Sequence, residues 1–123
     1  MSVFTDLENA ALSAIFEEVP ELSAVLREQQ KAASIVSREN DGGGFFTYLS
    51  VADNVPTISD RRLNLGDNVY ARVEGLTYGI GFLLIVQNGV MHVLDGHAIG
   101  VESTAHVDFA NVGFTMSNTP FDV

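Results

Sequence analysis

Residues 81–95, GFLLIVQNGVMHVLD, decide the fold of this chain, because two apolar runs meet there at Asn88-Gly89. An Asn-Gly pair between apolar runs is a strong signal for a β-hairpin with a two-residue turn, whose backbone needs positive φ at both turn residues. The sequence therefore predicts residue pairs that run outward from the turn: Gln87–Val90, Val86–Met91, Ile85–His92, Leu84–Val93, Leu83–Leu94 and Phe82–Asp95.

The first strand of this hairpin has no polar residue between Ile80 and Val86, so both of its faces are apolar. Such a strand is typical of the centre of a sheet that is covered on both sides. We expect helices on one face. The other face is expected to be closed by curling of the sheet around Phe109, Val112 and Phe114, or by an identical sheet in a symmetric homodimer. The homodimer is favoured, because no further helix is predicted that could act as a lid.

The N-terminal segment predicts two helices. Thr5 and Glu8 fit the capping box, in which each side chain accepts a hydrogen bond from the backbone amide of the other residue. Pro20 suits the first turn of a second helix and disfavours helical backbone at Val19, so the first helix is expected to end near Glu18.

After these helices the chain is rich in β-branched and aromatic residues, in runs bounded by Gly, Asn or Asp. Residues 52–66 are interpreted as a polar connection and residues 103–116 as a strand. The sequence predicts one α+β domain, with two N-terminal helices packed on a curled antiparallel sheet of about five to six strands. The predicted parts of this single domain, residues 1–123, are a helical layer at 5–30, a sheet at 33–116 and a ragged tail at 117–123.

The charge of the chain excludes several classes of partner. Sixteen acidic residues oppose six basic ones, which gives a net charge of -10, and no lysine or arginine follows Arg72. Binding to nucleic acids or to anionic membranes requires clusters of cations, so neither is expected. An acidic surface keeps a protein soluble, and it also suits docking to a basic protein.

The chain contains no cysteine, which excludes disulfides, thiolate metal sites and cysteine nucleophiles. Its longest apolar run is far shorter than the roughly 20 residues of a membrane helix. The first residues show neither a basic segment nor a long apolar segment typical of a signal peptide, so a cytoplasmic location is expected.

His92, His106 and Asp108 are the candidate catalytic residues, because a carboxylate beside an imidazole can orient a general base. His106 and Asp108 alternate along a predicted strand and would share a face. Asp95 is expected on the face of its strand opposite to His92, and no spacing typical of zinc ligands occurs. The sequence therefore predicts neither a metal site nor a cofactor.

Two further sets of residues are candidates for binding. The aromatic and arginine side chains that could line a pocket or clamp a carboxylate are Tyr48, Arg61, Arg62 and Tyr70. The acidic residues at the junction of the predicted helices, which could dock a basic partner, are Glu17, Glu18 and Glu21.

Residues 37–100 contain a Gly-Phe-Phe-Thr strand at residues 44–47 and a Gly-x-Gly-Phe strand at residues 79–82, followed by a two-residue turn and the Leu94-Asp95-Gly96 end. In these motifs the chain resembles a family of small bacterial proteins without a known activity. The resemblance implies a bacterial origin and a common fold, and it implies no chemistry. His97 stands where members of that family often have an aromatic residue.

These observations favour a non-enzymatic domain that binds a protein or a small ligand. One alternative is a small metal-dependent or acid/base-dependent hydrolase that uses the candidate catalytic residues. A further alternative is an immunity-type or regulatory partner of a basic protein.

Overall fold

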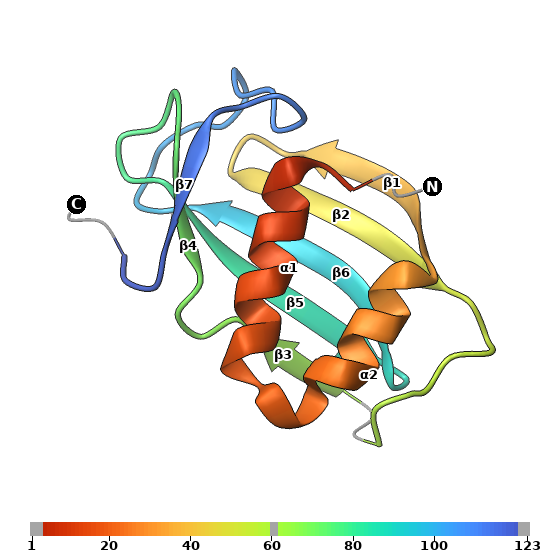
Figure 1. The fold of residues 1–123 in the computed structure, drawn as a ribbon. Helices are drawn as coiled ribbons and strands as arrows, with labels where there is room; N and C mark the ends of the chain where they lie inside the picture. The colour runs from red at the N-terminus through yellow and green to blue at the C-terminus, as the bar shows by residue number, and fades with distance from the viewer. Residues whose placement is uncertain (1–3, 60–61, 121–123) are drawn as a thin grey trace.

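The computed structural model describes residues 4–59 and 62–120. Two helices precede a single antiparallel sheet of seven strands, which confirms the predicted α+β class (Figure 1). The elements are α1 (Asp6–Glu18), α2 (Pro20–Lys31), β1 (Ala33–Asn40), β2 (Gly44–Val51), β3 (Arg62–Leu65), β4 (Tyr70–Val73), β5 (Ile80–Gln87), β6 (Val90–Ala98) and β7 (Phe114–Ser117).

Both helices begin, and α1 ends, as their sequence predicts, while α2 ends at Lys31, one residue beyond the predicted helical layer. The backbone amide of Glu8 donates to the Thr5 hydroxyl over 3.1 Å, and the Glu8 carboxylate accepts from the Thr5 amide over 2.9 Å, so the capping box is complete. Pro20 opens α2 directly after Val19. Neither helix, nor any other helix in the described part of the chain, is long and apolar enough to cross a membrane.

The strands lie in the order β1-β2-β6-β5-β4-β7, and β3 also pairs with β5. β3 pairs with the half of β5 next to the turn, and β4 pairs with the other half, at Ile80 and Gly81. β3 occupies the end of the stretch that the sequence analysis interpreted as a polar connection. It adds a short strand because Leu63 and Leu65 can pack against the core while Arg62 and Asn64, which alternate with them, stay exposed.

The hairpin between β5 and β6 has the predicted turn. Asn88 and Gly89 both have positive φ, at 55° and 81°. Gln87 pairs with Val90 and Val86 with Met91 as predicted, but His92 is an extra residue, and Ile85 pairs with Val93. The prediction was therefore wrong beyond the second pair, because a β-bulge shifts β6 by one residue.

This bulge sets which side chains of β6 enter the core. With uninterrupted pairing, Asp95 would lie opposite Phe82, which is 2% exposed beneath the helices. The shift instead sets Gly96 opposite Phe82 and moves Asp95 opposite Leu83, on the other face of the sheet. The bulge thus keeps a carboxylate out of the apolar core, where its charge would be strongly destabilising.

Residues 103–113 were predicted as part of a strand, but they form turns and irregular backbone, and only Phe114–Ser117 of the predicted strand pair in the sheet. Segments rich in Asp, Asn and Ser favour turns through local hydrogen bonds of their side chains, as Asp108 shows with the amide of Ala110. Of the predicted tail, Ser117 belongs to β7, and residues 121–123 lie outside the described part.

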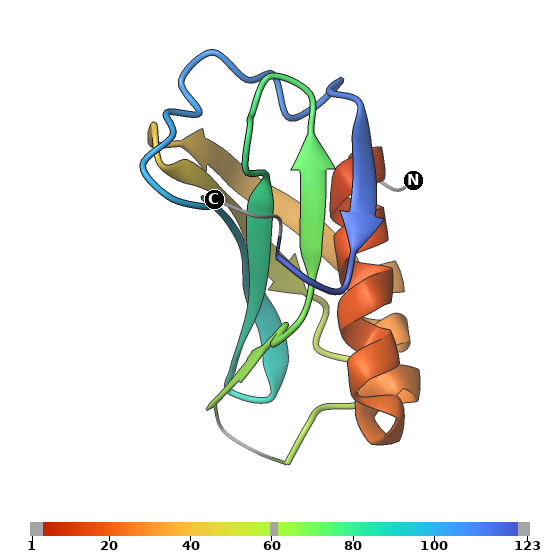
Figure 2. The same cartoon turned by 90° about the vertical axis from the view of Figure 1, so that its left-hand side faces the viewer.

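The helices cover one face of the sheet, and β4 and β7 curl toward α1 (Figure 2). Phe109, Val112 and Phe114 pack against the core on the helix side, where the rings of Phe45 and Phe109 lie 4.7 Å apart. The curling therefore closes the core beneath the helices. It does not cover the opposite face of the central strands, which we call the outer face.

Candidate functional site

Two rows of directly paired residues, each running across β2, β6 and β5, form an apolar centre on the outer face. Tyr48 pairs with Val93, which pairs with Ile85, and Phe46 pairs with Asp95, which pairs with Leu83. Directly paired residues in an antiparallel sheet point to the same side. The apolar residues of this centre are Phe46, Tyr48, Leu83, Ile85 and Val93.

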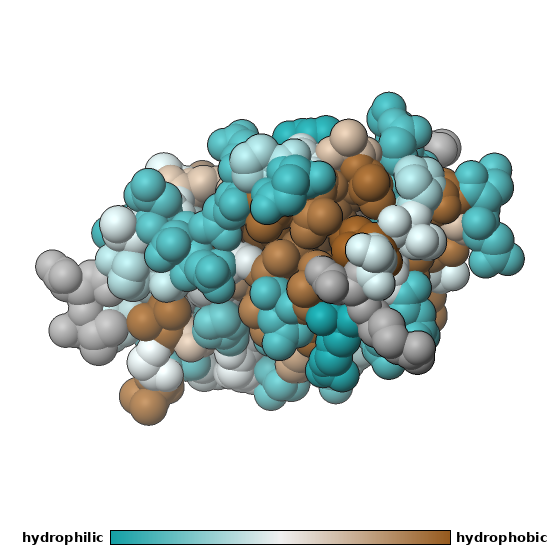
Figure 3. Space-filling model, turned by 90° about the horizontal axis from the view of Figure 1, so that it is seen from below, coloured by the Kyte–Doolittle hydropathy of each residue, from teal (hydrophilic) through white to brown (hydrophobic). Residues whose placement is uncertain are grey.

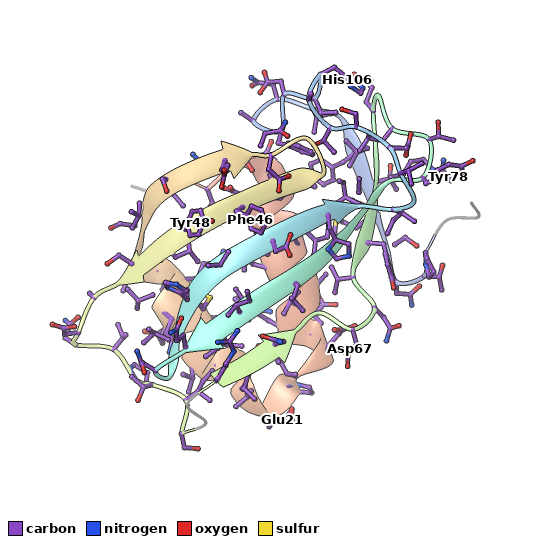
Figure 4. All side chains as sticks on the ribbon, turned by 180° about the vertical axis from the view of Figure 1, so that it is seen from behind. Glu21, Phe46, Tyr48, Asp67, Tyr78 and His106 are labelled. Carbon is purple, nitrogen blue, oxygen red and sulfur yellow. The ribbon has the colours of Figure 1, made fainter. Side chains whose placement is uncertain are left out.

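This centre is open to solvent in the described part of the chain. Figure 4 shows Phe46 and Tyr48 on the sheet surface, with no helix or strand of the described chain in front of them. Their rings lie 6.2 Å apart in a stacked arrangement. All members except Val93 are half-buried. Neighbouring side chains on the sheet cover one another, since the helices lie on the opposite side (Figure 2).

Asp95 is the ionisable group within this apolar centre. Burial between its neighbours raises the pKa of the Asp95 carboxyl above its ordinary value of 3.8. Attraction to His97 partly offsets this effect, and repulsion from Asp41 adds to it. Covering this surface would remove the carboxylate from water and raise its pKa further.

His97 fills the outer face beside Asp95. A side chain on Gly81 would come within 2.7 Å of the His97 Nε2 atom, so the imidazole lies over Gly81. Tyr70 pairs with Gly81 on the other side and is half-buried. His97 and Tyr70 therefore extend the outer face toward β4, and the glycine between them makes room for the imidazole.

The two margins of the outer face differ in charge. On β1, Glu39 points outward, because its neighbours Arg38 and Asn40 point to the helix side and bond there to Glu8 and to the Thr104 carbonyl. On the far margin, Arg62 of β3 alternates with the core residue Leu63 and is exposed. The outer face is thus acidic at the β1 margin and basic at the β3 margin.

A second hollow lies on the helix side, with a volume of about 250 Å³. It is bounded by the start of α1, the end of β1 and residues 107–110, and its lining is mainly apolar. The lining residues include Glu8, Arg38, Phe45, Phe109 and Ala110.

The polar group at the base of this pocket is the carboxylate of Glu8, which is 2% exposed. Arg38 donates to both oxygens over 2.8 Å, and the Thr47 hydroxyl donates over 2.6 Å. Burial raises the pKa of Glu8, but these bonds and the one from the Thr5 amide outweigh it, so the pKa lies below its ordinary value of 4.5. The cluster ties α1 to β1 and β2.

The candidate catalytic residues make separate local contacts. His92 lies at the bulge near the turn end of β6, whereas His106 and Asp108 belong to the loop beyond the other end of that strand. The His106 Nε2 atom lies 3.0 Å from the Gly75 carbonyl oxygen, and Asp108 accepts from Ala110 and Asn111. Within residues 4–59 and 62–120, no three His, Asp or Glu side chains are grouped to hold a metal ion.

Three of the four candidate ligand-binding residues lie on one surface. Tyr48, Arg62 and Tyr70 all lie on the outer face, on three different strands. They were predicted as candidates from the sequence, but their common surface was not. Arg61 lies outside the described residues.

The acidic candidates for partner binding lie at the α1–α2 junction. Glu17 and Glu21 are exposed, while Glu18 accepts a hydrogen bond of 2.9 Å from the amide of Asn68 and so holds the β3–β4 connection. Figure 3 views this end of the molecule and shows apolar side chains between hydrophilic ones. On the elements near this junction, the half-buried apolar residues that pack against the core include Val19, Leu22, Leu63 and Leu65.

The cluster of Glu8, Arg38 and Thr47 was not predicted from the sequence. Glu8 was assigned to the capping box, and nothing in the local pattern of Arg38 or Thr47 points to α1. Alternation along β1 and β2 could have set both residues on one face, but their pairing with α1 depends on where the helix crosses the sheet.

Comparisons with protein-family models, with curated proteins and with solved structures give no match to this chain. The resemblance to a bacterial family therefore stays a prediction.

Proposed function

We propose that this chain is a non-enzymatic protein-interaction domain and that its outer face binds a second copy of itself. The observation that carries the proposal is the apolar centre on the open side of the central strands. Exposed apolar surface of this kind is typical of protein interfaces, because it would otherwise promote non-specific association. A bacterial origin and a cytoplasmic location remain part of the prediction.

The size of the outer face suits a weak or moderate homodimer. From β1 to β3 the outer face spans four distances between neighbouring strands, each about 4.8 Å, and its strands are about 25 Å long. The area of the outer face is therefore roughly 500 Å² per copy. Two copies would bury about 1,000 Å², which lies at the low end of specific interfaces. We therefore expect a dissociation constant in the micromolar range, and a population of monomers in dilute solution.

A pair of variants tests this proposal. Ile85→Lys adds a charge to the centre of the outer face, and Ala24→Lys adds the same charge to an exposed position of α2. Sedimentation equilibrium should show a monomer for Ile85→Lys and an unchanged dimer for Ala24→Lys. Equal behaviour of the two variants would contradict the proposal.

The pocket beside Glu8 favours a second function, the binding of a small molecule. The hydrogen-bonding capacity of Glu8 is taken up by Arg38, Thr47 and Thr5, so the pocket selects for apolar contact rather than for a polar head group. We expect a small neutral aromatic compound to fit against Phe45 and Phe109. Titration calorimetry with indole tests this: Ala110→Leu should abolish binding, whereas Ala105→Leu, in an exposed turn, should not.

The geometry gives less support to the two alternatives, a hydrolase and a partner of a basic protein. The separate contacts of His92, His106 and Asp108 offer no joint acid/base group for a hydrolase. Docking of a basic protein at Glu17, Glu18 and Glu21 stays a prediction, although Glu18 already serves the β3–β4 connection.

A further inference from the structure

We propose that a groove at the C-terminal end of α1 binds a basic, partly apolar segment of another protein. The groove lies between α1 and the edge of the sheet, away from the apolar centre of the outer face, so this inference does not depend on self-association. It goes beyond the docking of a basic protein that the sequence predicts, because the groove adds an apolar floor and a further carboxylate, that of Asp67.

The groove consists of two adjoining hollows beside the last turn of α1. One hollow, of about 280 Å³, extends to the β3–β4 connection at Leu65. The other, of about 330 Å³, is lined by Ala14 of α1 and by Met116 of β7. Glu18 and Asn68 line both hollows, which therefore adjoin each other. Figure 2 shows α1 and β7 side by side, with the β3–β4 connection near the lower end of the helix.

The floor of the groove is apolar. Val19, Leu65 and Met116 are half-buried and pack against the core, and each lines one of the two hollows. Figure 3, which views the molecule from below, shows apolar side chains between hydrophilic ones at this end. Such a floor accepts apolar side chains, and it also accepts the methylene stems of lysine and arginine, whose charged ends stay in water.

Carboxylates surround this floor. Glu17 and Glu18 lie in the last turn of α1 and Asp67 in the β3–β4 connection, and all three residues are exposed. Among the described residues, neither lysine nor arginine lines the two hollows. Glu18 accepts a bond from the amide of Asn68, whereas no hydrogen bond or ion pair within the described part of the chain holds the side chains of Glu17 and Asp67. These two carboxylates are therefore available to cations of a partner.

The end of the helix adds a second reason for a cationic partner. The C-terminal end of a helix is the negative end of its dipole and is stabilised by cations, but the last turn of α1 carries two glutamates and no basic residue. Conflicts with a local rule of this kind are expected mainly at functional sites. A lysine or arginine of a partner would relieve the repulsion between the glutamates and the dipole.

The charge of the chain selects the kind of partner. Two copies with a net charge of -10 each repel one another, so a second copy is disfavoured as the occupant of this groove. A segment that combines lysine or arginine with leucine-like side chains matches both the carboxylates and the apolar floor.

A synthetic peptide tests the groove. The probe is a fluorescent ten-residue peptide in which Lys-Leu-Lys segments are joined by Gly-Ser, and the readout is its dissociation constant from fluorescence anisotropy in 50 mM salt. Glu17→Gln and Asp67→Asn should each weaken binding about threefold, and the double variant about tenfold, because each exposed charge contributes modestly and the two act independently. Replacing the leucines of the peptide with serine should weaken binding about fivefold or more, since the floor then loses its apolar contacts.

The matched control is the double variant Glu28→Gln with Asp53→Asn, which removes the same net charge at two exposed positions outside the groove. It should keep the dissociation constant within about twofold of that of the unmodified chain. Melting temperatures check that all variants fold, which is expected because the substituted side chains are exposed.

Three results would overturn the inference. Equal losses in the two double variants would show that the overall charge of the chain, rather than the groove, attracts the peptide. Equal binding of the leucine and serine peptides would show that the apolar floor is not used. Absence of binding at 1 mM peptide would show that the groove does not take a basic segment. None of these results bears on self-association through the outer face.

Discussion

The ring of Phe45 lies against the backbone of Gly96, in the space that a side chain at residue 96 would occupy. Gly96 pairs with Phe45 on one side and with Phe82 on the other, so it sits between two buried aromatic side chains of the central strands. The Phe45 and Phe82 rings meet edge to face, with centroids 6.1 Å apart. The bulge at His92 brings the glycine to this position.

Gly96→Ala should therefore destabilise the fold by about 1–3 kcal/mol, because a methyl group would collide with the Phe45 ring in a closely packed core. Gly43→Ala is the matched control, since a side chain there would meet its nearest neighbour, an Asp41 oxygen, at an ordinary 3.7 Å. Urea denaturation compares the two. Equal stabilities would show that the core around Phe45 is loose.

Phe82→Ala should be among the most destabilising single changes in the chain. The ring is 2% exposed beneath α1, and its loss should lower the free energy of unfolding by about 3–5 kcal/mol through the cavity that it leaves. Val36→Ala provides the control, because Val36 is 65% exposed at the bulge of β1. A thermal shift of similar size for both variants would contradict a buried central strand.

Glu8→Gln should destabilise the fold by about 1–3 kcal/mol at neutral pH, because it weakens charged hydrogen bonds from Arg38 and Thr47. The loss stays moderate because the Arg38 side chain is 40% exposed and remains partly hydrated. Glu28→Gln, which removes an exposed pair with Lys31, should change stability by less than about 0.5 kcal/mol.

The effect of Glu8 should depend on pH with a definite sign. Its pKa is lowered in the folded state, so the unfolded chain takes up a proton first as the pH falls. The stabilisation by Glu8 is complete above its ordinary pKa of 4.5 and is lost as the pH falls below that value toward the folded pKa. Urea titrations between pH 7 and pH 3 should show the gap between the unmodified chain and Glu8→Gln closing below pH 4.5. A gap that stays constant would contradict the ionised cluster.

Asp95 should have the opposite dependence on pH. Burial raises its pKa, and a second copy would bury it further, so the dimer takes up protons more readily than the monomer. Self-association should therefore strengthen as the pH falls toward the ordinary value of 3.8. Asp95→Asn should bind more tightly than the unmodified chain at pH 8, with a smaller response to pH. Sedimentation at pH 8, 6 and 5 measures this, and a dimer that weakens on acidification in both proteins would count against Asp95 lying in the interface.

Local patterns were enough to predict both helices, the α+β class and the turn at Asn88-Gly89, because a capping box, Pro20 and an Asn-Gly pair each act within a few residues. The register of β6 could not be predicted from the same local rules. The extra residue at His92 sets Gly96 against the ring of Phe45, which is more than forty positions away along the chain. Packing in the core therefore determines whether Asp95 or Gly96 pairs with Phe82.

Local sequence patterns also predicted the candidate sites only in part. The apolar second face of β5 was correctly predicted to lack cover from the helices, since two helices can cover only one side. The strand predicted around His106 and Asp108 was wrong, because alternation in the sequence was interpreted without the hydrogen bonds that Asp108 makes within its own turn. That Tyr48, Arg62 and Tyr70 share a surface depends on the strand order, which is not encoded in any single segment.

The molar mass of the unmodified chain in solution tests the central claim most directly. Light scattering coupled to gel filtration, at loading concentrations from about 1 µM to 500 µM, follows the mass as the chain is diluted. The outer face predicts a mass that rises with concentration from 13.3 kDa toward twice that value. A mass that stays at 13.3 kDa up to the highest concentration would contradict self-association through the outer face.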